Sequence, residues 1–159
     1  MMDWFVKRFI KASVAWLSLG VTLGLAMAMH PAWVIYRPAH LHMNLLGFVA
    51  MMIFGVAYHV IPRFTGHPLH SRRLAGAHWW IANVGLALFA LGFILAPHVP
   101  SASAPLLAIG GTLSAGGAYA FAYNIWRTVE GPAGVRQRRA QPAPAAAQPV
   151  GRRLPVAMQ

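Results

Sequence analysis

Residues 40–63 begin with His40-Leu41-His42-Met43-Asn44-Leu45-Leu46-Gly47-Phe48, continue through an apolar run, and end with Tyr58-His59-Val60-Ile61-Pro62-Arg63. The length and composition predict one membrane-spanning helix, which takes about 20 apolar residues. Two histidines lie near one end of this helix and a third lies near the other. An imidazole in hydrocarbon is costly unless it is hydrogen-bonded or bound to a ligand. A metalloporphyrin is the group that best explains three histidines on one such helix.

The composition excludes several classes of protein. Of 159 residues, 58% are hydrophobic and only two, Asp3 and Glu130, are acidic. The net charge of +11 comes from clusters that separate apolar runs and do not line one face, which argues against nucleic-acid binding. The chain has no cysteine, so disulfides, thiolate-held zinc, iron–sulfur clusters and covalent c-type heme attachment are excluded. Any heme would therefore be held by coordination and packing alone.

The apolar runs predict an all-α integral membrane four-helix bundle. We expect a basic lead at residues 1–11, a four-helix domain at 12–130, and a disordered Pro- and Ala-rich tail at 131–159. Gly20 and Gly24 in the first helix form a small-xxx-small face suited to close helix contact. The same helix also fits a secretory signal peptide cleaved after residues 26–28. The predicted helices cover residues 12–29, 39–61, where Pro62 should end the helix, 76–96 and 104–126.

The basic residues predict the orientation of the chain in a bacterial cytoplasmic membrane. Twelve of the thirteen lie in the N-terminal lead, the 63–75 loop or the C-terminal region, and only Arg37 lies in another connector. By the positive-inside rule, both termini and the 63–75 loop are cytoplasmic. The outer side then holds four histidines, His30, His40, His42 and His98.

His40 and His42 are two residues apart, so on a helix their side chains point about 200° away from each other. They cannot hold one small ion from the same side, since chelation within a helix uses i,i+4 spacing. Two planar cofactors, or one cofactor and one structural bond, suit this spacing, and neutral imidazole is a good axial ligand of heme iron. The alternative is that both rings only hydrogen-bond backbone or water at the start of the helix. His78 begins a predicted helix beside two tryptophans, so we expect it at the membrane interface.

Residues 12–127 resemble the last four helices of subunit I of the heme-copper oxidase superfamily, especially its cbb-type oxidases and nitric oxide reductase relatives. His40-Leu41-His42 resembles the His-x-His of the family's tenth helix, and Ile61-Pro62-Arg63 resembles the Val/Leu-Pro-Arg that ends it. His78-Trp79-Trp80 and Tyr123-Asn124-Ile125-Trp126-Arg127-Thr128 resemble parts of its eleventh and twelfth helices. The resemblance implies that His40 ligates a high-spin heme and His42 a low-spin heme.

The chain also departs from the family's pattern. Met43-Asn44 follows the histidine pair where the family has Ser-Gly or an aromatic variant. The family's copper ligands and its other low-spin ligand lie on earlier helices, which have no counterpart here. The chain is therefore oxidase-like by resemblance but lacks the copper ligands needed to reduce oxygen on its own.

The leading hypothesis is a membrane protein that binds heme b through His40 and His42 and acts in respiratory electron transfer or in binding a diatomic gas. Arg37, His98 and His30 are further candidates for contact with the cofactor, Arg37 through heme propionates. One alternative is a heme-free structural or assembly subunit of a larger oxidase or reductase; another is a heme-based gas sensor or heme carrier. The expected partners are heme, the lipid bilayer, and a respiratory electron donor or larger oxidase.

The chain is also expected to form a homo-oligomer, because the two histidines point to opposite flanks and four helices enclose little space. A neighbouring subunit would supply the second wall of a heme pocket. We expect a trimer over a dimer, although twofold symmetry is the commonest closure.

Overall fold

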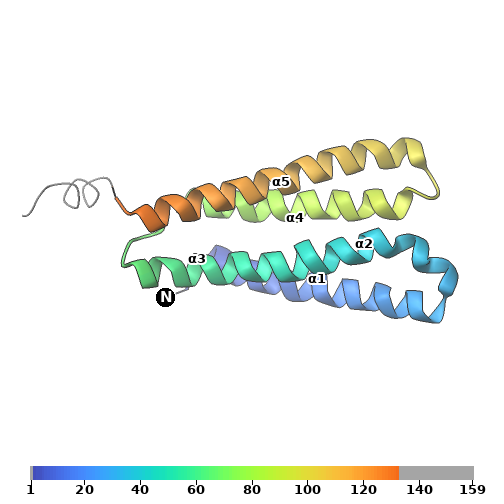
Figure 1. Cartoon of the computed structure of the whole chain (residues 1–159), viewed down its shortest axis with the longest axis horizontal. Helices are drawn as coiled ribbons and strands as arrows, with labels where there is room; N and C mark the ends of the chain where they lie inside the picture. The colour runs from blue at the N-terminus through green and yellow to red at the C-terminus, as the bar shows by residue number, and fades with distance from the viewer. Residues whose placement is uncertain (1, 133–159) are drawn as a thin grey trace, which may run out of the picture.

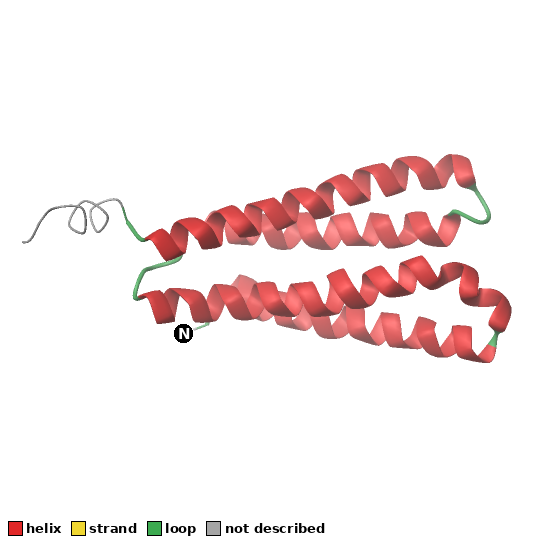
Figure 2. Cartoon of the chain, in the orientation of Figure 1, coloured by secondary structure: helices red, strands yellow, loops and turns green. Residues whose placement is uncertain are grey.

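The computed structural model describes residues 2–132, and every regular element in that range is helical (Figure 2). Four stretches are long and apolar enough to cross a membrane. They confirm the predicted all-α membrane four-helix bundle. Apart from its first two positions, the predicted tail lies outside the described residues. The four stretches are Trp4–Met29, Pro31–Thr65, Arg72–Leu95 and Pro100–Glu130.

The bundle consists of two antiparallel hairpins (Figure 1). In the first, α1 (Trp4–Met29) packs against a composite span built from four consecutive elements. In the second, α4 (Arg72–Leu95) packs along α5 (Pro100–Glu130). The composite span contains the 3₁₀ segment η1 (Pro31–Tyr36), α2 (Arg37–His42), the π-helical η2 (Met43–Ala50) and α3 (Met51–Thr65).

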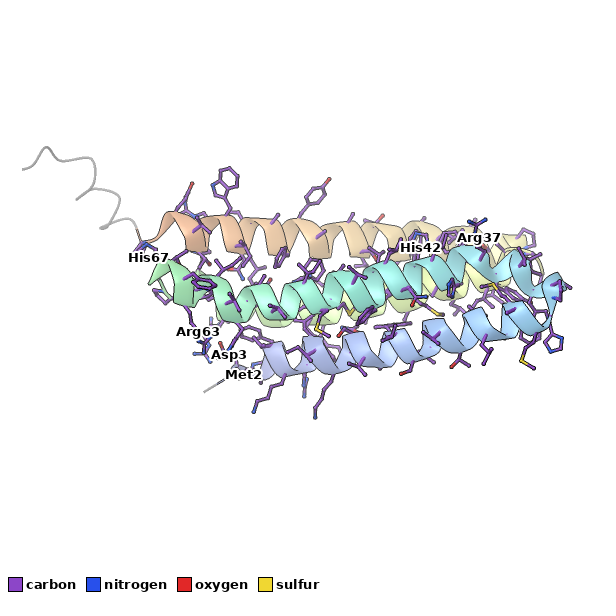
Figure 3. The ribbon with its side chains drawn as sticks, turned by 60° about the horizontal axis from the view of Figure 1, so that its bottom comes forward. Met2, Asp3, Arg37, His42, Arg63 and His67 are labelled. Carbon is purple, nitrogen blue, oxygen red and sulfur yellow. The ribbon has the colours of Figure 1, made fainter. Side chains whose placement is uncertain are left out.

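The termini of the helices and their connectors lie at two opposite ends of the bundle. The N-terminus, the α3–α4 connector and the end of α5 lie at one end, and the other two connectors lie at the opposite end (Figure 1). Figure 3 places Asp3, Arg63 and His67 at the first end, and Arg37 and His42 toward the second. This arrangement gathers the basic residues of the described range, except Arg37, at one end, as the predicted topology requires.

Helix α1 begins at Trp4, eight residues before the start predicted at residue 12. The predicted basic lead is therefore part of this helix. Its apolar residues Phe5, Val6 and Phe9 share one face and are buried, while Lys7 and Lys11 are exposed. This helix supplies much of the buried core, which favours a permanent span over a cleaved signal peptide.

Helix α3 runs past Pro62 to Thr65, so the prediction that Pro62 ends the helix was wrong. A proline removes only one helical hydrogen bond, and in the last turn few bonds remain to be lost. The hydroxyl of Thr65 donates to the carbonyl of Ile61 (3.0 Å) and satisfies one terminal acceptor. Gly66 then ends the helix in the left-handed conformation, with φ of 68°.

Helix α4 begins at Arg72, four residues earlier than predicted, because Ser71 caps it. The Ser71 Oγ accepts a hydrogen bond from the backbone N–H of Leu74 (3.1 Å). The connector before it is tied to α5: Asn124 exchanges two 2.9 Å hydrogen bonds with the backbone of Ser71. The hydroxyl of Thr128 accepts from the backbone N–H of His70 (3.0 Å). These bonds fix the α3–α4 connector and the start of α4 against the end of α5.

The π-helical segment Met43–Ala50 was not predicted. Such segments are rare and occur frequently at functional sites. In this one, Gly47 lies directly against α1, since a Cβ on Gly47 would lie 2.6 Å from the Cβ of Trp16. The wider turn begins immediately after His42, so it sets the angle between the histidine pair and α3.

The core between the hairpins is largely aromatic. Phe5 and Phe9 of α1 meet Tyr58 of α3, with ring centroids 5.7 and 5.9 Å from that of Tyr58. The imidazole of His78 lies inside this cluster and is fully buried. The prediction that His78 is interfacial was therefore wrong, because α4 begins earlier and carries it more than one turn into the bundle.

Helices α4 and α5 approach closely at Gly110, where an added Cβ would lie 2.4 Å from the backbone nitrogen of Phe89. Gly116, on the same helix, has nothing within 4 Å of the corresponding position. We predict that Gly110→Ala destabilises the bundle by about 1–3 kcal/mol, because backbone must shift to make room. Gly116→Ala should stabilise it by up to about 1 kcal/mol through helix propensity. Reversible unfolding in mixed micelles measures both, and equal stabilities for the two variants would contradict the observed packing.

Candidate functional site

The histidine pair lies on α2, a six-residue helix that follows the 3₁₀ segment η1. Pro38 lies in the first turn of α2, where a backbone N–H would have no acceptor within the helix, so the lack of an N–H on proline costs no hydrogen bond. The π-helical η2 follows directly. The pair is thus bounded by two irregular helical segments, which together fix the direction of each ring.

His40 points toward α1. Its Nδ1 lies 2.8 Å from the carbonyl oxygen of Gly20, and because a carbonyl only accepts, Nδ1 carries the proton. The ring also lies over Gly24, where a Cβ would come within 2.7 Å of Cε1. The predicted role of Gly20 and Gly24 in helix contact is confirmed by these contacts with the composite span. The lone pair of His40 is consequently on Nε2.

Asn44 supports His40 from the next turn. Its side-chain amide donates to the carbonyl oxygen of His40 (2.8 Å) and lies against Gly20, where a Cβ would be 2.6 Å from Nδ2. The amide nitrogen is also 3.3 Å from His40 Nδ1. Both atoms carry hydrogens in this arrangement, so that contact is not a hydrogen bond. Asn44 therefore holds the backbone of the pair and leaves Nε2 of His40 free.

His42 points away from α1, toward the second hairpin. Its Nδ1 donates to the carbonyl oxygen of Pro38 (2.7 Å), so the lone pair is again on Nε2. The imidazole stacks on Phe93 at 4.8 Å and 22°, and meets Phe89 edge-on at 4.7 Å. Both phenylalanines lie on α4, and Figure 3 shows His42 on the composite span toward the end of the bundle that holds Arg37. These contacts agree with the expectation that the rings of His40 and His42 point to opposite sides of their helix.

The two histidines share one chemical arrangement. In each, Nδ1–H is bonded to a backbone carbonyl and Nε2 carries an available lone pair. A hydrogen bond from the second ring nitrogen to a carbonyl is the usual support of a metal-bound histidine, and it fixes both tautomer and ring direction. The alternative prediction, that the rings only hydrogen-bond backbone or water, also accounts for Nδ1 and would leave water as the partner of Nε2.

The other predicted residues lie in or beside the connectors at the same end of the bundle. Arg37 is exposed at the start of α2. The Nε2 of His98 lies 2.7 Å from the hydroxyl of Tyr36, which ties the α4–α5 connector to η1. The ring of His30 lies 5.3 Å from that of Trp33. Within residues 2–132, the hydrogen bonds and ring contacts of these three residues do not include His40 or His42.

Phe89 and Phe93 were not predicted to be neighbours of His42. They are four residues apart on one predicted helix, and this spacing puts them on one face. The spacing alone does not say which helix that face meets. Within residues 2–132, no three histidine or acidic side chains cluster as a metal site would require. The pair therefore suits single axial ligation better than chelation of a bare ion.

The core beneath the pair has little free volume. A cavity of about 40 Å³ lies between the composite span and the second hairpin, one turn below His42 at Leu46 and Leu86. Cavities that enclose a drug-sized ligand measure about 300–1,000 Å³. This cavity is far too small for a porphyrin.

The sequence profile of the family described as cytochrome c and quinol oxidase polypeptide I matches residues 32–132. The chain belongs to this family. The match includes His40 and His42, and it confirms the resemblance to oxidase subunit I. Together with the four spans, membership establishes a multi-pass protein of the bacterial inner membrane.

Named relatives of this oxidase polypeptide I chain are all longer. The cbb3-type cytochrome c oxidase subunit CcoN1 of Stutzerimonas stutzeri is 29% identical over 79% of this chain and 33% of its own length. Cytochrome c oxidase polypeptide 1 of Halobacterium salinarum is 30% identical over 77% of this chain and 21% of its own length. A bacteroid cytochrome c oxidase subunit 1 homolog of Bradyrhizobium diazoefficiens is 28% identical over 78% and 28%. The chain spans a third or less of these relatives.

We predict that, in protein free of heme, the neutral form of His40 and of His42 carries its proton on Nδ1, because each Nδ1 donates to a carbonyl. Nitrogen-15 NMR of histidine-labelled protein in bilayers distinguishes the two tautomers. Signals are assigned by their loss in His40→Gln and His42→Gln. A neutral ring with its proton on Nε2 at either residue would contradict the proposed direction of the hydrogen bonds.

Proposed function

We propose that this oxidase polypeptide I chain binds heme b through the Nε2 of His42, with His40 as the second ligand-bearing residue. The observation that carries the proposal is the pair of carbonyl-anchored rings, each with a free Nε2 lone pair. Membership in the oxidase family supports the cofactor class. The absence of cysteine in the sequence favours a b-type, non-covalent heme.

The donor set fits a heme, but the interior of one chain does not enclose it. His42 has an aromatic support on the side of Phe89 and Phe93, and the cavity below measures only about 40 Å³. A heme needs a wall on both faces. We therefore propose that one chain supplies one ligand and one wall, and that another chain supplies the rest.

Each residue near the pair has a distinct part in this proposal. The carbonyl of Pro38 fixes His42 and raises the basicity of Nε2. Phe93 stacks on the ring and limits its rotation. Arg37, exposed one turn away, is suited to pair with heme propionates. Bound heme b would supply a one-electron redox centre or, with one axial position open, a site for a diatomic gas.

The proposed site faces the outer side of the membrane. Its end of the bundle holds one basic residue of the described range, Arg37, whereas the opposite end holds the rest. The positive-inside rule then places the N-terminus and the end of α5 in the cytoplasm. Electron transfer or gas binding at this level would be accessible to partners on the outer side or within the membrane.

We predict that His42→Ala removes or strongly reduces bound heme, because the substitution deletes the proposed ligand. His70→Ala is the matched control: its ring lies at the basic end, where it meets Tyr123 edge-on. Heme per protein is measured by pyridine hemochrome. His42→Gly supplemented with free imidazole should regain heme, which separates a lost ligand from a damaged fold. Full heme in His42→Ala would refute the assignment.

We further propose a homo-oligomer, with a trimer preferred to a dimer, in which the histidines of neighbouring chains face a shared heme. The support is the opposed direction of the two rings and the missing second wall. Native mass spectrometry of the complex released from nanodiscs should give three chains with heme bound at their interfaces. Two chains sharing one heme would support the dimer instead. A monomer that keeps its heme would contradict both, and assembly only with other subunits would indicate a place in a larger oxidase.

A further inference from the structure

The proposed heme site does not involve His78, yet His78 is the most deeply buried histidine of the described chain. Its exposed fraction is 0%, and it is enclosed by an aromatic cluster. Its Nδ1 lies 3.0 Å from the hydroxyl of Tyr58, itself only 2% exposed. An ionisable side chain held inside a membrane-spanning bundle is expensive and is seldom retained without a role. The rings that enclose it are those of Phe9, Phe54, Tyr58 and Phe121.

The second nitrogen of His78, Nε2, has no hydrogen-bond partner among the protein atoms of the described residues. This edge of the ring faces α5 at Gly117, where an added Cβ would lie 3.2 Å from Cδ2 and 3.6 Å from Nε2. The same position would lie 3.7 Å from the Cα of Ala82. The lack of a side chain on Gly117 therefore leaves space between the imidazole and Ala82.

Two neighbours of His78, Phe54 and Ala82, line the cavity of about 40 Å³, although His78 itself is not among the residues that line it. Ser114 also lines the cavity, and its buried Oγ likewise has no partner among the described protein atoms. Two unpaired buried polar groups thus lie at one helix interface, one turn apart along α5 at Gly117 and Ser114.

An unpaired buried polar atom costs about 1–3 kcal/mol, and this cost is removed if a water molecule bonds to it. A cavity needs at least about 10–15 Å³ of such volume to hold a water molecule, and the water needs polar partners. The cavity exceeds this volume and has Ser114 Oγ in its lining, and His78 Nε2 is a second unpaired polar atom at the same helix interface. An apolar ligand would satisfy neither Nε2 nor Oγ, so the chemistry of the two atoms selects water.

We propose that the core between α3, α4 and α5 contains an internal water site, in which water joins His78 Nε2 to Ser114 Oγ. The hydrogen-bonded chain then runs from Tyr58 through His78 and water to Ser114. The cavity continues to Leu46 and Leu86, one turn below His42 and Phe89. The site therefore places exchangeable water inside the membrane-spanning core, directly beneath the proposed heme ligand and on its cytoplasmic side.

The test is water-edited solid-state NMR of the full chain, labelled with ¹⁵N-histidine and reconstituted in bilayers. We expect transfer of magnetisation from water protons to Nε2 of His78 at short mixing times. The Nε2 signal of His78 is assigned by its loss in His78→Phe. As an independent check, Tyr58→Phe removes the hydroxyl bonded to Nδ1 and should shift the Nδ1 signal of the same ring. Absence of water transfer to His78 Nε2 in the unsubstituted protein would overturn the proposal.

A pair of α5 variants locates the water. Ser114→Val removes the hydroxyl and fills the cavity, so it should abolish the transfer to Nε2 while the Nδ1 signal is unchanged. Thr112→Val is the matched control: the hydroxyl of Thr112 is exposed and donates to the carbonyl of Ala108 on its own helix (2.8 Å). Transfer should persist in this control. Undiminished transfer in Ser114→Val would show that water reaches His78 elsewhere and would contradict the site.

Discussion

The arrangement of this bundle depends on the need of every polar group in a membrane to find a partner within the protein. His40 meets that need through the carbonyl of Gly20 on a neighbouring helix (2.8 Å). The bond is accessible because Gly20 and Gly24 have no side chains to keep the imidazole away. His42 meets it through the carbonyl of Pro38 on its own helix. One constraint thus fixes the packing of α1 against the composite span and directs both Nε2 atoms.

Much of the fold could be predicted from the sequence because hydropathy and charge report directly on membrane spans. The four helices, the shared end of the basic residues and the opposed directions of His40 and His42 all follow from composition and helical geometry. The boundaries did not follow, because they depend on local hydrogen bonds. Ser71 caps α4 earlier than the apolar pattern indicates, and Thr65 and Gly66 carry α3 past Pro62.

The details of the candidate site were less predictable for a related reason. The π-helical turn after His42 depends on how Gly47 meets Trp16 on another helix, which no local pattern encodes. The stacking of His42 on Phe93 likewise depends on how the hairpins dock. His78 was placed at the interface by its two tryptophan neighbours, and the earlier start of α4 moves it into the core.

In the proposed function, a chain that spans a third or less of its oxidase relatives supplies a heme ligand and leaves part of the pocket to another chain. The most direct measurement is the reduced-minus-oxidised difference spectrum, with hemochrome quantification, of the unsubstituted protein purified in nanodiscs from heme-sufficient cells. We expect a coloured protein with the spectrum of b heme, whether six-coordinate with sharp bands or five-coordinate and shifted by carbon monoxide. A colourless protein that is folded and contains no extractable heme would contradict the proposed function, and would support a heme-free structural subunit instead.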